Sequence, residues 1–317
     1  MPVVVSLPEI KKALGAIDPL PLIEEGFVAY SRGRAVVPPV GELVFDDPPG
    51  DVHIKYGYIR GGKVYVIKIA SGFPGNPRLG LPSGDGLMLV FDQKTGTLLA
   101  VLLDEGYLTN VRTAAAGAVV AKYLAPRRVT AVGVLGAGVQ GRMQLDMLRR
   151  VRSFDRAIVW GISDEELAAY RRDMGSPGLA IVTTRRAEEV AAAANLIVTC
   201  TPSTSPLLKA EWIRPGTHIT AVGSDTAEKQ ELDAAILARA DRVVVDSLSQ
   251  SELRGEVFKA VSAGAIGRER LVELGRVIEE AGLRRASEDE ITVADLTGVA
   301  VQDIQISAAV WDQLQLR

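Results

Sequence analysis

Three charged residues stand where charge is unexpected, and together they could act on an anionic substrate. Lys68 interrupts the apolar run Val64–Ala70. On a strand it points either to solvent, as most lysines do, or into a pocket. Arg112 lies near the start of an alanine-rich helical stretch. There a cation opposes the helix dipole, so it is either solvated or matched by an anion such as a substrate carboxylate or a phosphate.

Asp225 is the third charged residue, and it follows the apolar run that ends at Gly223-Ser224. If that run is a strand of a parallel sheet, Asp225 lies beyond its carboxyl end, where ligands of doubly wound sheets bind. The alternative is that Asp225 or Ser224 caps a helix.

A glycine loop offers a site for a dinucleotide. Gly136-Ala-Gly138-Val-Gln-Gly141 follows the β-branched run 129–135 and precedes a helical pattern. The first glycine of such a loop allows a tight turn, the second lets a pyrophosphate approach, and the third lets helix and strand pack closely. The helix N-terminus adds N–H groups for the phosphates. An ordinary strand-to-helix turn is the alternative, but the strand before and the helix after favour a dinucleotide site.

A second glycine- and proline-rich pair of segments, 72–76 and 80–83, follows Lys68. Such residues build rigid turns of the kind that surround a site.

The elements that must position these residues are of two kinds. Helices are predicted over 7–33, interrupted by Pro19 and Pro21, and over 108–124, capped by Thr109 or Asn110. Between them, alternating patterns predict antiparallel strands at 53–59, 64–70, 86–91 and 98–103. From 129 onward strands alternate with helices, which is typical of a doubly wound parallel sheet, and 295–316 is predicted to be one long helix packing back on the first domain.

We therefore predict an α/β protein with a Rossmann-type doubly wound parallel sheet at 125–298. An antiparallel α+β domain would comprise 1–124 with 299–317.

Composition excludes several classes of function. A net charge of -3 gives no broad attraction to nucleic acid or to an anionic membrane. The single cysteine, Cys200, excludes an intramolecular disulfide and a cysteine-rich metal site, and the presence of only two histidines, His53 and His218, argues against a histidine-based metal site. Since neither a membrane-spanning run nor a signal pattern is present, we expect a soluble cytoplasmic protein.

Taken together, these segments resemble the ornithine cyclodeaminase/μ-crystallin family along nearly the whole chain. The matching segments are Lys68 with 72–76 and 80–82, 108–115, 136–140, 222–225, and 295–303. The family includes ornithine cyclodeaminase, one type of alanine dehydrogenase and reductases of α-imino acids. Its shared chemistry is hydride exchange between a nicotinamide and the α-carbon of an amino or imino acid.

The resemblance implies roles for individual residues. Arg112 and Lys68 would hold the substrate carboxylate, and Lys68 could also donate a proton or orient a water. Asp225 would face the substrate nitrogen. The positions expected near the cofactor, NAD or NADP, are Ser83, Gly136, Gly138, Val139, Gln140, Gly141, Thr201, Gly223, Lys229, Thr297 and Gly298. Thr297 is expected to line the substrate site as well.

The resemblance also implies a homodimer formed through the antiparallel domain, which would bind the substrate. We expect an NAD(P)-dependent amino acid dehydrogenase or imine reductase. The alternatives are cyclodeamination of ornithine to proline and ammonia, and a non-catalytic binder of small molecules.

Two departures from the family pattern bear on the substrate. An arginine usually follows the Pro-Pro pair, but here Pro38-Pro39 precedes Val40-Gly-Glu42. His53 stands where ornithine cyclodeaminase has an acidic residue. His53 and Lys55 share one face of a strand, with Tyr56 and Tyr58 on the other. Either the charged face is solvated and the tyrosines pack inward, which the pattern slightly favours, or His53 or Lys55 lines the pocket and favours acidic substrates.

The residue that selects between NAD and NADP is also unusual. In NAD-binding proteins of this kind, an acidic residue about 20 residues past the glycine loop hydrogen-bonds to the ribose 2′-hydroxyl. Gly161 and Ile162 occupy that place, and Asp164 beyond them is predicted to cap the next helix. We therefore expect both cofactors to be usable.

Overall fold

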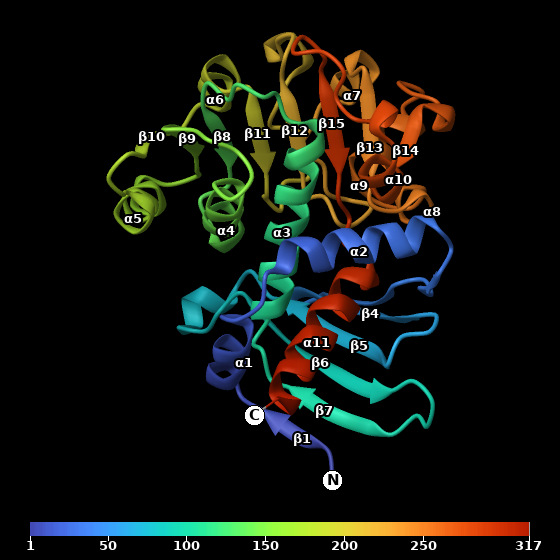
Figure 1. The fold of residues 1–317 in the computed structure, drawn as a ribbon. Coiled ribbons are helices and arrows are strands. Elements are labelled where there is room, and N and C mark those ends of the chain that lie inside the picture. The colour runs from blue at the N-terminus through green and yellow to red at the C-terminus, as the bar shows by residue number, and fades with distance from the viewer. Residues whose placement is uncertain (317) are drawn as a thin grey trace. The chain divides into compact units, whose positions relative to one another are not determined.

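The computed structural model describes residues 1–316 and contains two compact units. Unit 1 consists of residues 1–112 and the C-terminal segment from Val299, and unit 2 is Thr113–Gly298. The division falls inside helix α3 (Tyr107–Leu124), which the chain follows from one unit into the other (Figure 1). No helix in the described part of the chain is both long and apolar enough to cross a membrane.

Unit 1 is built on a sheet with strand order β1-β7-β6-β5-β4-β2, in which β3 also pairs with β4. All pairs are antiparallel except β1 with β7. The strands are β1 (Val3–Val5), β2 (Ala35–Val36), β3 (Gly41–Asp46), β4 (Pro49–Ile59), β5 (Val64–Gly72), β6 (Gly84–Asp92) and β7 (Leu98–Leu102). The four strands predicted from alternation are confirmed, whereas β1, β2 and β3 were not predicted.

The helices of unit 1 are α1 (Leu7–Leu14), α2 (Pro19–Ser31), the first residues of α3, a short 3-10 turn η1 (Asn76–Leu79) and α11 (Ala300–Gln315). The proline break in the N-terminal helix is confirmed. Helix α11 lies along one face of the sheet (Figure 1), where the Ser307 hydroxyl donates to the Met88 sulfur at 2.8 Å.

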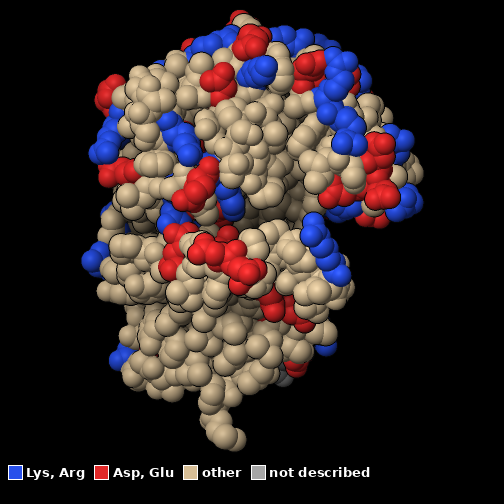
Figure 2. Space-filling model, turned by 180° about the vertical axis from the view of Figure 1, so that it is seen from behind, with Lys and Arg blue, Asp and Glu red and all other residues tan. Residues whose placement is uncertain are grey.

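The two faces of this sheet correct a prediction. His53 and Lys55 are 7% and 4% exposed, whereas Tyr56 is 37% exposed. The polar residues therefore face inward and the tyrosines outward, so the expectation of a solvated polar face was wrong. Cross-strand pairs continue an outer apolar row from Tyr56 through Ile67 and Leu89 to Val101. In Figure 2 the face of unit 1 on view carries few charged side chains.

Unit 2 contains a parallel sheet with strand order β10-β9-β8-β11-β12-β15-β13-β14. The strands are β8 (Val132–Leu135), β9 (Arg156–Trp160), β10 (Ala180–Thr184), β11 (Leu196–Thr199), β12 (His218–Ala221), β13 (Arg242–Val245), β14 (Leu271–Glu273) and β15 (Thr292–Asp295). The helices are α4 (Val139–Leu148), α5 (Asp164–Met174), α6 (Ala187–Ala193), α7 (Ala234–Arg239), α8 (Leu248–Ser251), α9 (Gly255–Ser262) and α10 (Leu274–Glu279), with 3-10 turns η2 (Ala210–Trp212), η3 (Arg268–Arg270) and η4 (Ala281–Leu283).

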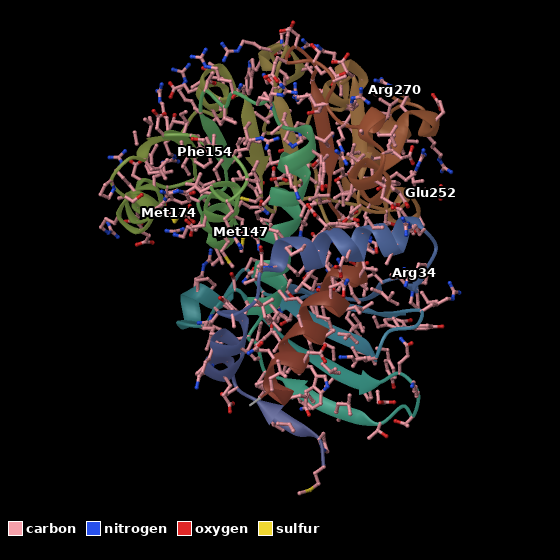
Figure 3. The ribbon with its side chains drawn as sticks, viewed as in Figure 1. Arg34, Met147, Phe154, Met174, Glu252 and Arg270 are labelled. Carbon is pink, nitrogen blue, oxygen red and sulfur yellow. The ribbon has the colours of Figure 1, made fainter. Side chains whose placement is uncertain are left out.

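This sheet is covered by apolar side chains of the helices. One buried cluster joins β8 and β9 to α4 and α5, and Phe154 and Met174, both labelled in Figure 3, pack against it. The doubly wound parallel sheet predicted from the alternation is therefore confirmed. The long C-terminal helix begins at Ala300 rather than at Asp295, because Thr292–Asp295 is a fully buried strand between β12 and β13.

Two predicted helix caps were wrong. Helix α3 begins before Thr109 and Asn110, and the Asp104 carboxylate accepts the Leu108 N–H at 2.8 Å. Helix α5 is capped by Ser163, whose hydroxyl accepts the Glu166 N–H at 3.1 Å, and Asp164 is its first residue. In both cases a polar side chain just upstream reaches the free N–H groups first.

Candidate active site

A buried cluster of charged side chains lies on the inner face of the unit 1 sheet. Lys68 Nζ is 3.4 Å from Asp303 Oδ2, and Arg112 Nε is 3.0 Å from Asp303 Oδ1. Lys68, Arg112 and Asp303 are 2%, 5% and 1% exposed. Since lysine and arginine are almost never buried without a partner, this arrangement answers the question that the sequence left open: both cations are matched by a carboxylate inside the fold.

Three elements bring these groups together. Lys68 lies on β5 directly opposite Lys55 on β4, so the two ammonium groups start from neighbouring positions on the same face. Arg112 comes from the second turn of α3, and Asp303 from the first turn of α11. The anion needed near Arg112 is thus supplied in part by Asp303 itself.

The cluster retains unused hydrogen-bonding capacity. Arg112 Nη1 donates to Gln302 Oε1 at 3.1 Å, whereas the ion pairs to Asp303 are not aligned as hydrogen bonds. Among residues 1–316, Gln302 Nε2 and both Asp303 oxygens are buried without a hydrogen-bond partner. A buried polar atom without a hydrogen-bond partner destabilises the fold, and a bound polar ligand is one way to supply that partner.

The environment of Lys68 tunes its proton affinity. The pKa of Lys68 is lowered from 10.5 to about 7, chiefly by burial and also by the neighbouring cations Arg112 and Lys55, whereas Asp303 opposes the shift. An ammonium that titrates near neutral pH can both hold a carboxylate and exchange a proton.

His53 has a carboxylate partner. His53 Nε2 lies 2.9 Å from Glu42 Oε1, across the pairing of β4 with β3. Glu42 therefore offsets any charge on His53. Of the two residues proposed to replace the missing arginine, Lys55 is the one directly opposite Lys68.

The loop that follows β5 is held in a compact form. Phe73 N–H donates to Ser83 O at 2.7 Å, and the Asn76 amide donates to Pro82 O at 3.0 Å. These bonds close the loop where β5 pairs with β6, as its turn residues predicted. Ser83 is exposed on this loop in unit 1.

The glycine loop in unit 2 fits a pyrophosphate group. Gly136 has φ +120°, and a Cβ at Gly141 would lie 2.0 Å from Gly136 O, so these glycines permit the turn and the close packing of α4. A Cβ at Gly138 would meet no atom within 4 Å, and no side chain caps α4 there. The helix N-terminus therefore faces open space, as an approaching phosphate requires. Val139 and Gln140 open this helix, and Val139 is 59% exposed.

Three strand ends meet beside this loop because β8, β11 and β12 are neighbours in the parallel sheet. The order reverses between β8 and β11, which is the switch point where ligands of such sheets bind. The buried Glu231 links two of these ends: it accepts hydrogen bonds from Thr199 Oγ1, from Thr201 N and Oγ1, and from Gly223 N, at 2.6–2.9 Å. Burial raises the pKa of Glu231 to about 7 despite these bonds.

Thr297 and Gly298 lie at the next strand end, after β15. Asp246 accepts the Thr297 hydroxyl at 3.1 Å and the Gly298 N–H at 2.6 Å, and Gln250 donates to Thr297 at 2.8 Å. Gly298 has φ +84°, which a glycine tolerates best. The predicted cofactor positions of unit 2 therefore share one edge of its sheet.

Asp225 lies in the loop after β12, and no helix begins there, so the capping explanation was wrong. Its Oδ1 is 2.7 Å from Lys229 Nζ, and the side chain is 33% exposed. The Ser224 hydroxyl donates to Lys229 O at 2.7 Å and so shapes the loop.

Sequence analysis did not assign a role to Asp303, Gln302, Glu42 or Glu231. Asp303 had a usable signal, because it is a lone acid in the helical stretch 300–310, which is otherwise uncharged. Its partners precede it by about 190 residues or more, as the Arg112–Gln302 bond illustrates with a separation of 190. Within the described residues, no group of three or more His, Cys, Asp or Glu side chains is arranged to hold a metal ion.

Comparison with known proteins places the chain among enzymes of amino and imino acids. It is 37% identical to an alanine dehydrogenase of Archaeoglobus fulgidus, over 96% of this chain and 92% of the relative. It is 35% identical to an iminosuccinate reductase of Paracoccus denitrificans, over 91% and 89%. A solved archaeal alanine dehydrogenase dimer with bound NAD superposes with a TM-score of 0.89 at 34% identity, covering 99% of this chain and 96% of that one.

A family model covers almost the whole chain. The model of the ornithine cyclodeaminase/mu-crystallin family matches residues 2–316, which include the buried cluster of unit 1 and the strand ends of unit 2. The protein therefore belongs to the ornithine cyclodeaminase/mu-crystallin family.

Proposed function

We propose that this protein catalyses NAD(P)-dependent hydride transfer at the α-carbon of a small amino or imino acid. The observation that carries the proposal is the buried cluster of Lys68 and Arg112 around Asp303, with the buried Lys55 directly opposite Lys68. A site that keeps several cations out of water suits a substrate that brings carboxylate groups. The family membership and the alanine dehydrogenase and iminosuccinate reductase relatives support the same class of reaction.

Each chain residue then has a role. The Arg112 guanidinium binds the substrate carboxylate as a fork, with Lys68 as a second cation. Lys68, with its pKa near 7, gives a proton to the substrate nitrogen during imine reduction and takes it back in the reverse direction. Asp225 carries negative charge toward the iminium nitrogen. His53 and Thr297 line the substrate site.

The cofactor would be held by the glycine loop and the neighbouring strand ends. Gly136, Gly138 and Gly141 would receive the pyrophosphate at the start of α4. Its nicotinamide would supply or accept the hydride. Residues proposed to surround the nicotinamide are Ser83, Val139, Gln140, Thr201, Gly223, Lys229, Thr297 and Gly298.

A group of buried cations favours acidic substrates. Lys68 and Arg112 are buried beside Asp303, and the buried Lys55 lies directly opposite Lys68. A dicarboxylic acid would bring a second carboxylate to this face of the sheet. The same cations would repel the distal ammonium of ornithine.

We predict that Lys55→Ala raises KM about tenfold for an acidic imino acid and changes it little for a neutral one, since a desolvated charge contact contributes about 1.5–3 kcal/mol. His53→Ala should have a smaller effect, because Glu42 already pairs with His53. The measurement is the ratio of kcat/KM for oxaloacetate plus ammonia to that for pyruvate plus ammonia.

Lys63→Ala is the matched control, because Lys63 belongs to the same unit but is 79% exposed and pairs with Asp312. If Lys55→Ala and Lys63→Ala give the same ratio of kcat/KM for the two substrates, Lys55 does not contact the second carboxylate of the substrate.

Ornithine cyclodeamination is the alternative within the family. It reduces and reoxidises the cofactor in one turnover, so no net change in cofactor absorbance accompanies ammonia release. Following absorbance and ammonia with ornithine, and with 2-oxo acids plus ammonia or methylamine, separates the reactions. Faster conversion of ornithine to proline than reduction of any imine would overturn our proposal, and inactivity throughout would favour a small-molecule binder.

For the cofactor, we predict that NAD and NADP are both used, with a preference below about 1000-fold, or roughly 4 kcal/mol. At the end of β9, Asp164 is 90% exposed and its carboxylate lies 3.5 Å from Arg185. The acid disfavours a 2′-phosphate and the arginine favours it, so the pair discriminates weakly. Side-by-side kinetics with both cofactors test this, and Asp164→Ser should shift the preference toward NADP.

We also propose a homodimer formed through the outer face of the unit 1 sheet. The outer apolar row, Tyr56, Ile67, Leu89 and Val101, crosses four strands where a sheet of a monomer normally presents polar residues. Beside it, Leu43, Val44 and Phe45 of β3 are 54%, 72% and 42% exposed. A second copy would cover this surface, and the dimeric archaeal relative supports it.

Accordingly, Ile67→Glu combined with Leu89→Glu should convert the dimer to a monomer, because two facing carboxylates cannot be buried in an apolar interface. Light scattering coupled to size exclusion gives the mass directly. Glu25→Gln, an exposed change on α2, serves as the control. This interface would be excluded if the wild-type protein had the mass of a single chain, or if the double variant still had the mass of a dimer.

A further inference from the structure

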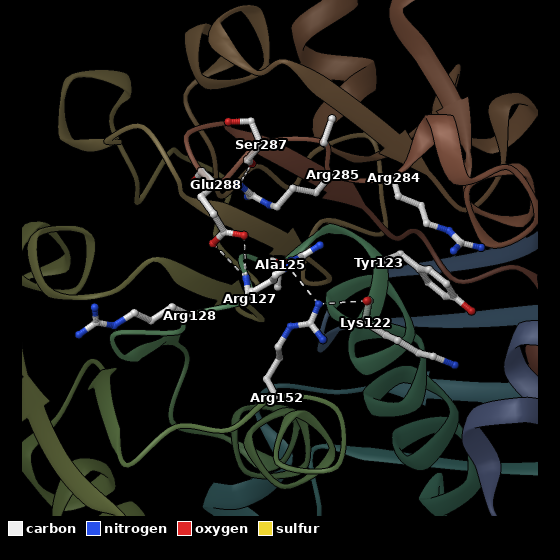
Figure 4. Close-up of a pocket in the computed structure, with 11 residues that line it drawn as sticks. Lys122, Tyr123, Ala125, Arg127, Arg128, Arg152, Arg284, Arg285, Ser287 and Glu288 are labelled. Atoms are coloured by element: carbon white, nitrogen blue, oxygen red, sulfur yellow. Dashed lines mark hydrogen bonds between the residues drawn. The ribbon is translucent and has the colours of Figure 1, made fainter.

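A basic hollow in unit 2 has no role in the proposed reaction. It has a volume of about 760 Å³ and is lined by Lys122, Tyr123, Ala125, Arg127, Arg128, Arg152 and Arg284–Glu288. These residues come from the end of α3, the link to β8, the turn after α4 and the link to β15 (Figure 4). They therefore lie at the amino end of the parallel sheet, whereas the glycine loop and the other cofactor positions lie at its carboxyl end.

The hollow concentrates positive charge in an acidic protein. Its lining contains Lys122, Arg127, Arg128, Arg152, Arg284 and Arg285 but only one acid, Glu288. The chain as a whole has a net charge of -3. Glu288 accepts the backbone N–H of Arg127 at 3.2 Å, and its charge partly offsets those of Arg152 and Arg285.

Part of the lining is fixed in position. Arg152 Nη2 donates to Lys122 O at 3.0 Å, and Arg285 Nε donates to Leu124 O at 2.6 Å, so both cap the C-terminus of α3. Arg284 lies 4.8 Å above the Tyr123 ring. Burial lowers the pKa of Arg152 and of Arg285, and the charge of Arg152 lowers that of Arg285 further, whereas Glu288 opposes both shifts and Glu290 opposes that of Arg285. Holding these cations together costs free energy that a bound anion would recover.

Helix capping does not account for the remaining basic groups. Arg127 and Arg128 are exposed, and within the described residues their guanidinium groups make no hydrogen bond or ion pair. Arg152 Nε is buried and lacks a hydrogen-bond partner there. Arg127 and Arg128 therefore leave guanidinium donors available, and Arg152 leaves its Nε, because its Nη groups already donate to backbone carbonyls. In Figure 4 the Arg128 side chain extends away from Arg127 and Arg152.

We propose that this hollow binds a small multivalent anion, of the class of organic polyphosphates. Guanidinium groups bind phosphate oxygens in pairs, and several adjacent phosphates match several adjacent arginines. The volume lies within the roughly 300–1,000 Å³ typical of small-molecule sites. A single carboxylate or chloride ion would leave most of the charge unbalanced.

Calorimetric titration with inorganic tripolyphosphate tests the proposal on the full chain at about 0.15 M salt, where weak surface pairing is screened. Saturating NAD is present so that the glycine loop is filled. One site per chain is expected. Arg127→Gln combined with Arg128→Gln should weaken binding at least tenfold, while orthophosphate binds the wild type at least tenfold more weakly than tripolyphosphate.

The matched control is Arg34→Gln with Arg172→Gln, which removes the same charge from exposed positions outside the hollow. Binding within twofold of the wild type is expected for it. Equal weakening by both double variants, or no saturable binding with NAD present, would overturn the proposal. If a single-stranded oligonucleotide bound more tightly than tripolyphosphate, the proposed small anion would be wrong and the hollow would be a nucleic-acid site.

Discussion

Replacing Lys68 with methionine is expected to lower kcat by about 100-fold or more, as is usual when a positioned acid or a preorganised charge is removed from a reacting centre. Methionine has similar length and fills the buried space, so the change removes the charge and the proton while largely keeping the packing. Stopped-flow and steady-state rates of imine reduction, at saturating substrate and cofactor, provide the measurement.

Lys63→Met is the control, since it makes the same chemical change at a residue that is 79% exposed. Circular dichroism must show that Lys68→Met is folded, because its loss leaves Asp303 with one cation fewer. A folded Lys68→Met enzyme with near-normal turnover would remove Lys68 from the site.

The pH dependence separates a proton donor from a merely structural cation. The pKa of Lys68 is lowered to about 7, chiefly by burial, so its ammonium is present below that pH and lost above it. Imine reduction should therefore slow as pH rises through about 7, and amine oxidation should accelerate. Lys68→Arg stays charged and should abolish this inflection. Asp303→Asn should move it to lower pH, because Asp303 raises the pKa of Lys68.

The half of the candidate site that lies in the parallel sheet could be predicted because its signals are local. Gly136, Gly138 and Gly141 follow an apolar run and open a helix within a few residues, and Asp225 lies in the loop shortly after its strand, which ends at Ala221. Parallel strands then place such ends on one edge whatever their order. The order itself was less accessible: β15 was not predicted, and its last residue, Asp295, was assigned to the C-terminal helix, which begins at Ala300.

The cluster in unit 1 could be predicted only in part, for a physical reason. Alternation on β4 separates His53 and Lys55 from Tyr56, but it does not say which face is buried. The usual rule puts charge outside, and here it fails because acids inside the fold compensate buried cations: Glu42 pairs with His53, and Asp303, far along the chain, pairs with Lys68 and Arg112. Places where a local rule fails with a compensating partner are often functional, which is why Lys68 was the most informative residue in the sequence.

Asp225→Asn is expected to lower kcat by about 100-fold or more with a much smaller change in the KM of the carboxylate substrate. Asn keeps the shape and the hydrogen-bonding oxygen but loses the negative charge that would hold an iminium nitrogen. Ser224→Ala is the matched control, because it disturbs the same loop through its bond to Lys229 O without touching the carboxylate.

Lys229 offers a sharper comparison, since its ammonium lies 2.7 Å from Asp225 Oδ1. If Asp225 serves the substrate nitrogen, Lys229→Gln should raise the KM of the cofactor while kcat falls far less than in Asp225→Asn. If Asp225 serves only to position Lys229, the two variants should lose kcat equally and share a raised cofactor KM. Equal losses of kcat in Asp225→Asn and Lys229→Gln would therefore mean that Asp225 acts in cofactor binding rather than on the substrate. Lys68 would remain the proposed proton donor.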